Sequence, residues 1–297
     1  MSRAIRLSAA PILFLLLWSA GFPVARLGLD HAEPLTLLAL RYVLVLVLLV
    51  PVALVMRPPL PGSWAEAGHV AVVGFLIQVV YFGLCYTAFK AGVSAGTVAI
   101  VVCLQPILVA LAAPWVVGEA VGGRAWLGLV LGLAGAAMVI LARSRVAVED
   151  PGDLALVFVA LLGMTGAALW EKRFGVGQHP VMSNLIQYAV GAAFALPLSL
   201  ATETMRIAWN WEFLGVMAYL VLGNSLLALS LLLAMIRSGE VARVSALFYL
   251  VPPLAALFAW PMLGEVMPPA GWVGMALAAL GVALASRRRG RERHIRE

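Results

Sequence analysis

The sequence predicts an all-α membrane protein, with ten transmembrane helices arranged in two inverted five-helix repeats. Three observations support this fold class: the apolar composition, the number and length of the apolar segments, and a constant register that relates the two halves of the chain. The 297 residues are 63% hydrophobic and 11% charged, whereas about 25% of residues are charged in an ordinary soluble domain. Because a soluble core cannot hide that much apolar surface, we expect lipid to be the solvent.

The apolar segments have the length of membrane-spanning helices. At 1.5 Å per residue, crossing the ~30 Å hydrocarbon layer takes about 20 residues. Backbone groups in lipid must be paired within their own segment, and the period-two alternation of barrel strands is absent, so these segments should be helices. Ten runs qualify, at about residues 9–29, 35–56, 69–89, 94–117, 125–142, 153–172, 180–201, 213–236, 241–263 and 269–286.

The chain contains one stretch twice. Residues 98–119 read VAIVVCLQPILVALAAPWVVGE, and residues 244–265 read VSALFYLVPPLAALFAWPMLGE. Pro106 corresponds to Pro252 and Gly118 to Gly264, an offset of 146 residues in both cases (252 − 106 and 264 − 118). The same offset pairs Tyr42 with Tyr188, Gln78 with Asn224, Trp126 with Trp272, Gly128 with Gly274 and Gly135 with Gly281. We therefore expect a first repeat in residues 1–146 and a second in residues 147–297.

An odd number of helices per repeat makes the second copy enter the membrane from the opposite side, so the repeats are inverted. The basic residues predict the orientation, because cytoplasmic loops are enriched in Lys and Arg. With both termini cytoplasmic and the joint at 143–152 outside, fourteen basic residues lie inside and five outside. The inner set is Arg3, Arg6, Arg57, Arg124, Lys172, Arg173, Arg237, Arg243 and the six arginines after Ser286; the outer set is Arg26, Lys90, Arg143, Arg145 and Arg206.

This architecture resembles the drug/metabolite transporter superfamily. Each half ends in a Pro–apolar–Gly-Glu stretch and a Gly-rich helix, and the segments LLLWSAGFPVARLGL and RYVLVLVLLVPVAL are similar to the first two helices of its EamA-domain branch. Within that branch the chain is most similar to YddG-type amino-acid exporters. The resemblance implies a bacterial inner-membrane transporter that exports amino acids, aromatic or otherwise apolar, or related small metabolites.

Polar and aromatic residues near the middle of the spans are the candidate substrate-binding residues. Trp18 lies at mid-depth beside Gly21 and Pro23, whereas membrane tryptophans usually lie at the headgroups. Gln78 and Asn224 are symmetry-related amides near the midplane, with Tyr81 on the same helical face as Gln78. The alternative for Trp18 is a lipid-facing position or core packing, and the alternative for Gln78 and Asn224 is an interhelical hydrogen bond.

Two proline-interrupted spans supply further candidates. Gln105 precedes Pro106, and Tyr249 precedes Pro252-Pro253. Because proline removes an amide donor and leaves a carbonyl unpaired, such a helix at membrane depth is expected to line a cavity, to act as a hinge or simply to kink for packing.

Arg41, Thr165 and Trp170 are assigned either to the substrate or to the structure. Arg41 lies about 9 Å into its span, where a charge normally faces protein or water. It is expected either to bind a substrate carboxylate or to play a structural role, by reaching toward the interface or holding a loop carbonyl. Trp170 precedes Glu171-Lys172-Arg173 and has the position of an interface anchor.

The sequence offers no sign of an enzyme, a metal site or a cofactor site. Gly92-Val-Ser94-Ala-Gly96 matches the G-x-S-x-G nucleophile pattern, but that motif needs a strand-turn-helix context, and here it opens a membrane helix. Cys85 and Cys103 lie in apolar runs and are expected to be packing residues. The +6 charge is concentrated in the basic tail, which suits membrane lipid better than nucleic acid. A small-molecule substrate and lipid are the expected partners, and a monomer is expected.

The positions of the acidic residues predict facilitated transport. All fourteen lie in loops, in the tail or at helix ends, whereas proton-coupled carriers commonly place a carboxylate or histidine inside the bilayer. We therefore expect alternating access without proton coupling. A multidrug or other metabolite carrier of the same fold, including a proton-coupled one, is the alternative, and a channel or an intramembrane enzyme is a more distant one.

Overall fold

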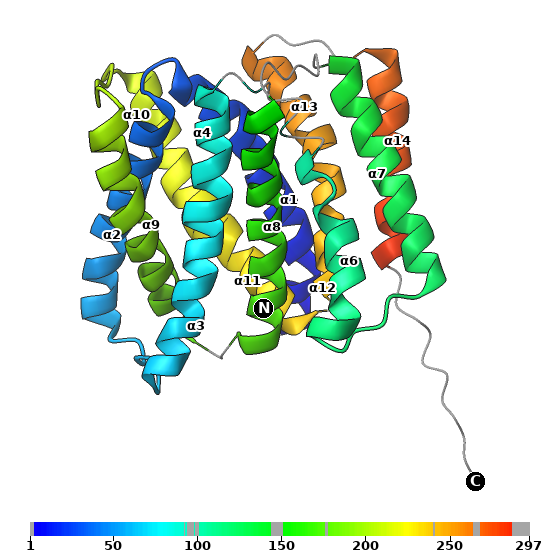
Figure 1. Ribbon diagram of the computed structural model, residues 1–297, viewed down its shortest axis with the longest axis horizontal. Helices are drawn as coiled ribbons and strands as arrows, with labels where there is room; N and C mark the ends of the chain where they lie inside the picture. Colours follow the sequence, from blue (N-terminus) through cyan, green and yellow to red (C-terminus); the bar gives the residue numbers. More distant parts are fainter. Residues whose placement is uncertain are drawn as a thin grey trace.

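The structure is a computed structural model that describes residues 3–91, 93, 98, 101–143, 151–175, 178–239, 241–263 and 268–286. The regular secondary structure of the described residues is helical, apart from a single isolated bridge between Ala32 and Ile207. The helices stand side by side as a bundle whose loops gather at its two ends (Figure 1).

Nine helical stretches among the described residues are long and apolar enough to cross a membrane. The first half contains α1 (Arg3–Leu29), α2 (Pro34–Met56), a third span built from α3 (Trp64–Gly74), η1 (Phe75–Gly83) and α4 (Leu84–Lys90), then the shorter α6 (Gln105–Val116) and α7 (Gly123–Arg143). The second half begins with α8 (Pro151–Phe174) and α9 (Pro180–Thr202). Its next span is built from α10 (Trp211–Ala218), η2 (Tyr219–Ala228) and α11 (Leu229–Ser238). A further span is built from α12 (Val241–Ala246), η3 (Leu247–Leu250) and α13 (Val251–Leu263), and α14 (Pro269–Ser286) follows. The predicted all-helical membrane fold is confirmed.

The predicted fourth span, 94–117, is described only in part. Residues 94–97, 99 and 100 lie outside the described residues. The G-x-S-x-G match at Gly92, Ser94 and Gly96 therefore also lies outside them. From Gln105 onward the helix is regular and ends at Val116.

The contact between α7 and α14 shows how the two repeats are related. A Cβ added to Gly135 would collide with the backbone of Ala278, and a Cβ added to Gly281 would collide with the backbone of Gly132. Ala278 is the repeat counterpart of Gly132, and Gly281 is the counterpart of Gly135. A two-fold rotation therefore maps each contact onto the other. The helices α7 and α14 pack antiparallel, as inverted repeats require.

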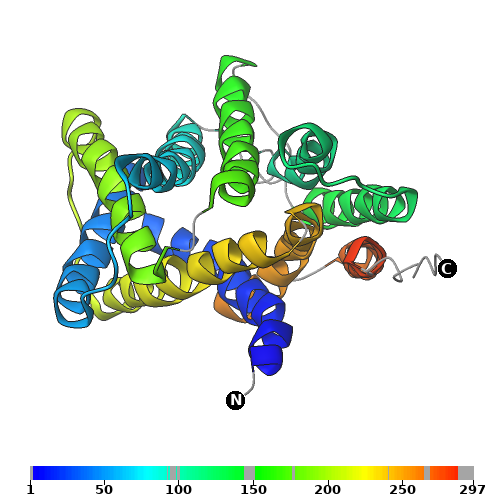
Figure 2. The same ribbon diagram turned by 90° about the horizontal axis from the view of Figure 1, so that it is seen from below.

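A second symmetric contact lies between α2 and α9, on the opposite side of the bundle from α7 and α14 (Figures 1 and 2). The rings of the counterparts Tyr42 and Tyr188 meet with centroids 5.5 Å apart. The Tyr42 hydroxyl donates to the carbonyl of Gln78 at 2.9 Å, and the Tyr188 hydroxyl donates to the carbonyl of Ser225 at 3.2 Å. Both acceptors lie in π-helical segments, η1 and η2, where the wider turn loosens the regular helical bonding.

The two proline-interrupted helices break at corresponding places. A turn at residues 103–104 precedes α6, whose first residues are Gln105 and Pro106. The 3₁₀ segment Leu247–Leu250 precedes α13, whose second residue is Pro252. The interrupted backbone predicted from the prolines is thus present in both halves. Proline has no backbone N–H, so neither Pro106 nor Pro252 can donate the hydrogen bond that would continue the preceding helix.

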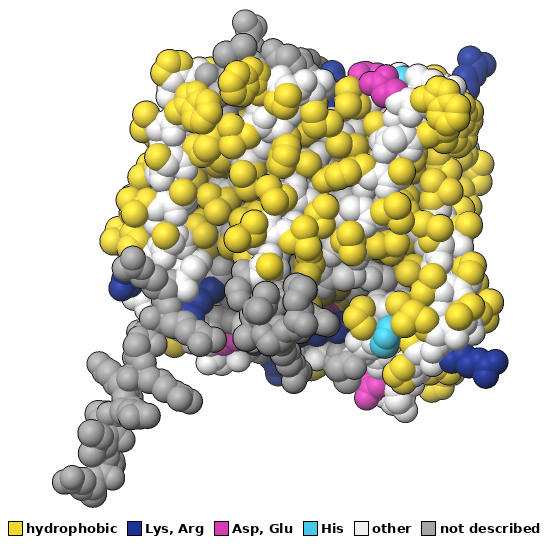
Figure 3. Space-filling view, turned by 180° about the vertical axis from the view of Figure 1, so that it is seen from behind, with side chains coloured by type: hydrophobic (Ala, Val, Ile, Leu, Met, Phe, Trp, Pro, Cys, Tyr) yellow, Lys and Arg dark blue, Asp and Glu magenta, His cyan; other side chains and the backbone are white. Residues whose placement is uncertain are grey.

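The flank of the molecule is apolar and its charges lie at the two ends (Figure 3). Large hydrophobic side chains such as Leu54, Val55 and Leu200 are exposed on it. Exposed tryptophans near helix ends, such as Trp64, Trp115 and Trp211, suit the two headgroup layers. This surface is that of a multi-pass membrane protein.

Candidate functional site

A cavity of about 1230 Å³ opens at one end of the bundle. Its rim is polar and comes from the segment that joins α1 to α2 and from the loop before α10. The last residue of α1 and Pro268, just before α14, also line it, so the start of α1 and the end of α14 lie toward the opposite end. The charged and polar rim residues are Arg26, Asp30, His31, Glu33, Thr204 and Arg206.

The rim is held together by contacts between α1–α2 and the loop after α9. Glu203 accepts hydrogen bonds from the backbone amides of Leu35 and Thr36, at 2.9 and 2.6 Å, and so caps the start of α2. In return, Glu33 accepts from the backbone amide of Thr204 at 2.6 Å. Glu33 and Glu203 are therefore both engaged by backbone donors.

Aromatic rings line the inner part of the cavity. The indole of Trp18 lies 6.1 Å from the ring of Phe82 and 5.9 Å from that of Phe248, measured between centroids. Trp18 is only 3% exposed. The three rings come from α1, η1 and η3, so the wall spans both repeats. Such a surface suits an apolar or aromatic body of a small molecule.

Arg41 lines the same cavity and is bound to neutral partners from the other repeat. Its Nε donates to Ser225 Oγ at 2.6 Å, and its Nη2 donates to Asn224 Oδ1 at 2.7 Å. The guanidinium lies 5.1 Å from the centroid of Phe82. Gly21 leaves the space that the Asn224 amide occupies, since a Cβ there would collide with Asn224 Nδ2.

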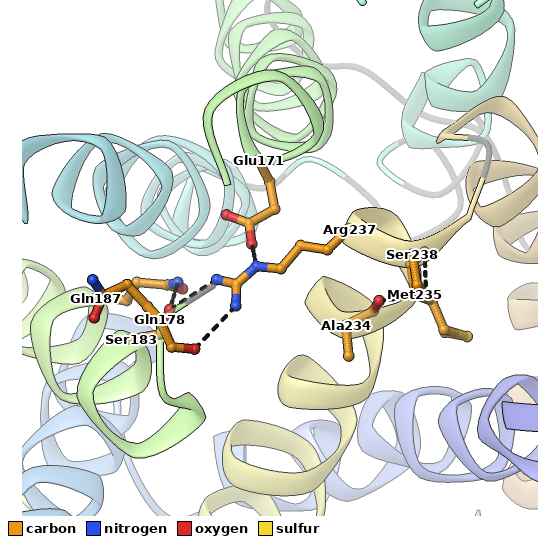
Figure 4. Close-up of polar contacts among 8 residues, drawn as sticks. All are labelled: Glu171, Gln178, Ser183, Gln187, Ala234, Met235, Arg237 and Ser238. Atoms are coloured by element: carbon orange, nitrogen blue, oxygen red, sulfur yellow. Dashed lines mark hydrogen bonds and ion pairs between the residues drawn. The ribbon is translucent and has the colours of Figure 1, made fainter. Parts of the chain in front are cut away.

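Ion pairs close the opposite end of the bundle. Glu171, buried near the end of α8, pairs with Arg237 near the end of α11, and Arg237 also donates to Ser183 Oγ on α9 (Figure 4). Lys172 pairs with Glu119 at 3.2 Å and donates to the carbonyl of Gly239 at 2.6 Å. We call these groups the closed-end cluster. It ties helices of both repeats together where the cavity does not reach.

The predicted candidates divide into two groups. Trp18, Tyr81, Asn224 and Arg41 line the cavity. Five others do not appear in its lining: Gln78, Gln105, Tyr249, Thr165 and Trp170.

The candidates outside the lining contact neighbouring helices or their own helix. Gln78 is buried against Gly191, and neither atom of its amide has a hydrogen-bond partner. Gln105 donates to Ser245 Oγ at 3.4 Å, which links α6 to α12. Tyr249 packs against Gly132, and Thr165 donates to the carbonyl of Leu161 in its own helix. The ring of Trp170 lies tilted against those of His69 and Phe174, with centroids 5.8 and 4.6 Å away, toward the closed end.

The sequence prediction missed several lining residues. Phe82 directly follows Tyr81, and Phe248 directly precedes Tyr249, so both lie in segments from which the sequence supplied a candidate. Tyr86 was also missed, although it lies one turn beyond Phe82 and five residues beyond Tyr81, which are spacings that share a face in wide helical turns. Cys85 and Cys103 were predicted to be packing residues; both are buried and both also line the cavity.

The described residues hold no group of three or more His, Cys, Asp or Glu side chains that could bind a metal ion. The cavity opens at one end of the bundle, and its lining does not include the closed-end cluster. Inverted helical repeats around an aromatic and polar cavity are an arrangement found in membrane transporters.

Comparison with known proteins agrees with this class. The EamA-like transporter family model matches residues 8–141 and 151–287, and the chain belongs to that family. This is a family of transporters, not of enzymes, and its two matches coincide with the two halves of the bundle.

Individual relatives are distant but are matched over most of their length. The chain is 21% identical to the "Uncharacterized inner membrane transporter YedA" of Escherichia coli, covering 91% of this chain and 87% of that protein. It is 27% identical to a "Probable terminal-alkyne amino-acid exporter" of Streptantibioticus cattleyicolor, covering 94% and 93%. It is 25% identical to an "S-adenosylmethionine/S-adenosylhomocysteine transporter" of Chlamydia trachomatis, covering 90% and 85%.

A solved crystal structure of a protein has the same fold. It superposes with a TM-score of 0.79 at 20% sequence identity, covering 93% of this chain and 96% of that chain.

Proposed function

We propose that this protein exports amino acids, aromatic or otherwise apolar, or related small metabolites across the bacterial inner membrane by alternating access. The observation that carries the proposal is the cavity of about 1230 Å³ with its wall of Trp18, Phe82 and Phe248. Its size is above the usual range for sites that enclose drug-sized ligands, so an amino acid has ample room. A relative named as a probable amino-acid exporter supports the substrate class.

Alternating access is supported by the difference between the two ends. The rim is open, and the closed-end cluster lies at the other end, where the Glu171–Arg237 ion pair is inside the second repeat and the Lys172–Glu119 pair joins the two repeats. A channel would need a path open at both ends at once. In an inverted-repeat carrier, rocking of one part against the other exchanges the open and closed ends around the same site.

The orientation we propose places both termini in the cytoplasm and the joint at 143–152 outside. The start of α1 and the end of α14 lie at the same end of the bundle, as an even number of spans requires, and the basic residues favour that end as cytoplasmic. The open rim then faces the periplasm. Reporter fusions after Ser286 and within the joint test this orientation; cytoplasmic activity of the joint fusion would contradict it.

The function is tested by counterflow in liposomes. Purified protein is reconstituted, loaded with an excess of one unlabelled amino acid, and diluted into a trace of the same labelled amino acid, across a panel of aromatic, aliphatic and polar examples. A carrier transiently concentrates the label inside, whereas a channel only equilibrates it. Protein-free liposomes are the control. If no amino acid gives counterflow while an unrelated drug or metabolite does, the proposal fails in favour of another carrier of the same fold.

The second candidate is a carrier for larger metabolites. A relative named as an S-adenosylmethionine/S-adenosylhomocysteine transporter is matched over 90% of this chain, and the cavity volume does not exclude a ligand of that size. Including S-adenosylmethionine in the counterflow panel separates the two candidates.

A further inference from the structure

Arg41 is a buried charge with no opposite charge beside it. It lies seven residues into α2, about 10 Å from the start of the helix, and is 3% exposed. Among the described residues, no carboxylate lies within ion-pair distance of it. A buried charge is normally paired, because removal from water without compensation is costly.

The described partners of the guanidinium are all neutral. Of its five N–H groups, one on Nε donates to Ser225 and one on Nη2 donates to Asn224, which holds the group in place from η2 of the other repeat. The hydroxyls of Tyr86 and Tyr188 also lie within interaction range of it. None of these oxygens compensates the positive charge, and Arg41 lines the cavity. A planar fork of this kind matches the two oxygens of a carboxylate.

The charges around the cavity are unevenly distributed. Asp30 and Glu33 belong to the rim, and Glu33 already accepts hydrogen bonds from Thr204. Below the rim, Arg41 is the residue that carries a charge at neutral pH among the described lining residues. A molecule that passes the rim therefore meets a positive charge in otherwise neutral, largely apolar surroundings, where an electrostatic interaction is weakened little by water.

We propose that Arg41 binds the carboxylate of the transported molecule, so that the protein selects small carboxylates with an apolar body. The inference rests on the proposed function and narrows its substrate class. Phe82 joins the two parts of the site, because its ring lies under the Arg41 guanidinium and also against Trp18. A carboxylate on Arg41 thus places the apolar body on the aromatic wall. An amino acid satisfies this and remains net neutral; its amides and esters do not.

The first test compares ligands on the wild-type protein in detergent. Two matched pairs are used: 3-phenylpropanoate against 3-phenylpropanamide, and L-phenylalanine against L-phenylalaninamide. Each pair keeps the ring and exchanges a carboxylate for a carboxamide. We expect the acid to bind at least about tenfold more tightly in one pair or both, the ratio typical of a hydrogen bond to a charged group. Equal binding within both pairs, or no binding by either acid, overturns the proposal.

The second test removes the charge. Arg41→Gln should abolish the preference for the acid, and Arg41→Lys should restore part of it, because a lysine keeps the charge but lacks the fork. Arg124→Gln, which removes an exposed arginine at the start of α7, is the matched control and should keep the full preference. An acid preference that persists in Arg41→Gln overturns the proposal.

These outcomes are separable from those of the proposed function. Binding is measured without transport, so counterflow can fail while the acid preference stands. Conversely, counterflow of amino acids together with equal binding of acids and amides would retain the transporter and refute the role of Arg41. Should both Arg41 variants fail to fold, the ligand pairs on wild-type protein still decide.

Discussion

Trp18 differs from most other tryptophans of this chain in its surroundings. Trp64, Trp115 and Trp211 are 93%, 81% and 88% exposed near the ends of helices, whereas Trp18 is 3% exposed in the middle of α1. Three aromatic neighbours bury Trp18 at that depth: the rings of Phe14, Phe82 and Phe248 all contact its indole. A tryptophan held by three rings at a cavity wall offers a rigid, preorganised surface for an apolar ligand.

We predict that Trp18→Ala weakens the binding of L-phenylalanine by roughly tenfold or more, because the aromatic contact is lost. Trp18→Phe should retain most of the affinity. Isothermal titration or a scintillation proximity assay on folded, monodisperse protein measures the effect. Trp115→Ala, which removes an exposed indole, is the control. Equal affinities of Trp18→Ala and Trp115→Ala would show that the ligand body lies elsewhere.

At the scale of elements, the pair α7 and α14 packs through backbone approach. Gly135 contacts the backbone of Gly274 and Ala278, and Gly128 contacts the backbone of Gly281 and Ala285. In lipid no hydrophobic effect drives helices together, so close packing of small residues is a main source of their association. Side chains at these positions would force the helices apart.

Gly135→Ala should therefore lower the stability of the folded protein by about 1–3 kcal/mol, the usual cost of overpacking. Gly215→Ala, at a helical position of α10 with open space around its Cα, should instead be neutral or stabilising by up to about 1 kcal/mol. Thermal unfolding in the same detergent compares them. If Gly135→Ala melts no lower than Gly215→Ala, the backbone contact between α7 and α14 is not as tight as the structure has it.

The closed-end cluster joins helices that belong to different repeats or to different parts of one repeat. The side chain of Glu171 is 2% exposed and that of its partner Arg237 is 21% exposed, whereas Glu119 and Lys172 are each 21% exposed. Removing the partner of the buried Glu171 leaves an uncompensated buried charge, and the same change costs less in a pair whose two members both reach water.

A double-mutant cycle with Glu171→Gln and Arg237→Gln should give a coupling free energy of at least about 1 kcal/mol, since the two groups depend on each other. The parallel cycle with Glu119→Gln and Lys172→Gln should give less, because water screens that pair. Thermal or denaturant unfolding supplies the values. A smaller coupling for Glu171–Arg237 than for Glu119–Lys172 would show that the burial of Glu171 does not strengthen its ion pair.

For the whole molecule, the polar groups of the cavity indicate how transport is driven. Below the rim, the described lining has no carboxylate or imidazole that could take up and release a coupling proton. The buried Glu171 lies in the closed-end cluster, paired with Arg237. Arginine does not deprotonate at physiological pH. These groups favour facilitated diffusion down the gradient of the substrate.

We expect an imposed pH gradient, with the membrane voltage held at zero, to leave the final internal amino-acid concentration equal to the external one. Labelled amino-acid uptake into proteoliposomes measures this, with and without a protonophore. Glu171→Gln is the informative variant if a proton effect is seen. Accumulation above equilibrium that disappears with the protonophore would establish proton coupling instead.

The sequence alone determined the class of solvent, the helical fold and the duplication. These properties depend on composition, on run length against bilayer thickness, and on a register that recurs without gaps, all of which are independent of how helices turn about their axes. It also located the breaks before Pro106 and Pro252, because proline disrupts a helix wherever the helix is packed.

Only the tertiary structure decided which side chains reach the cavity. The sequence cannot show how a helix is rotated, and η1 and η3 depart from the α-helical period, so Phe82 and Phe248 line the cavity beside the expected Tyr81 and in place of Tyr249. The repeat register does not bring both amides to the cavity: Asn224 lines it, and its counterpart Gln78 does not. A two-fold axis in the membrane plane exchanges the open and closed ends, so in any one conformation counterparts such as Arg41 and Gln187 have different surroundings.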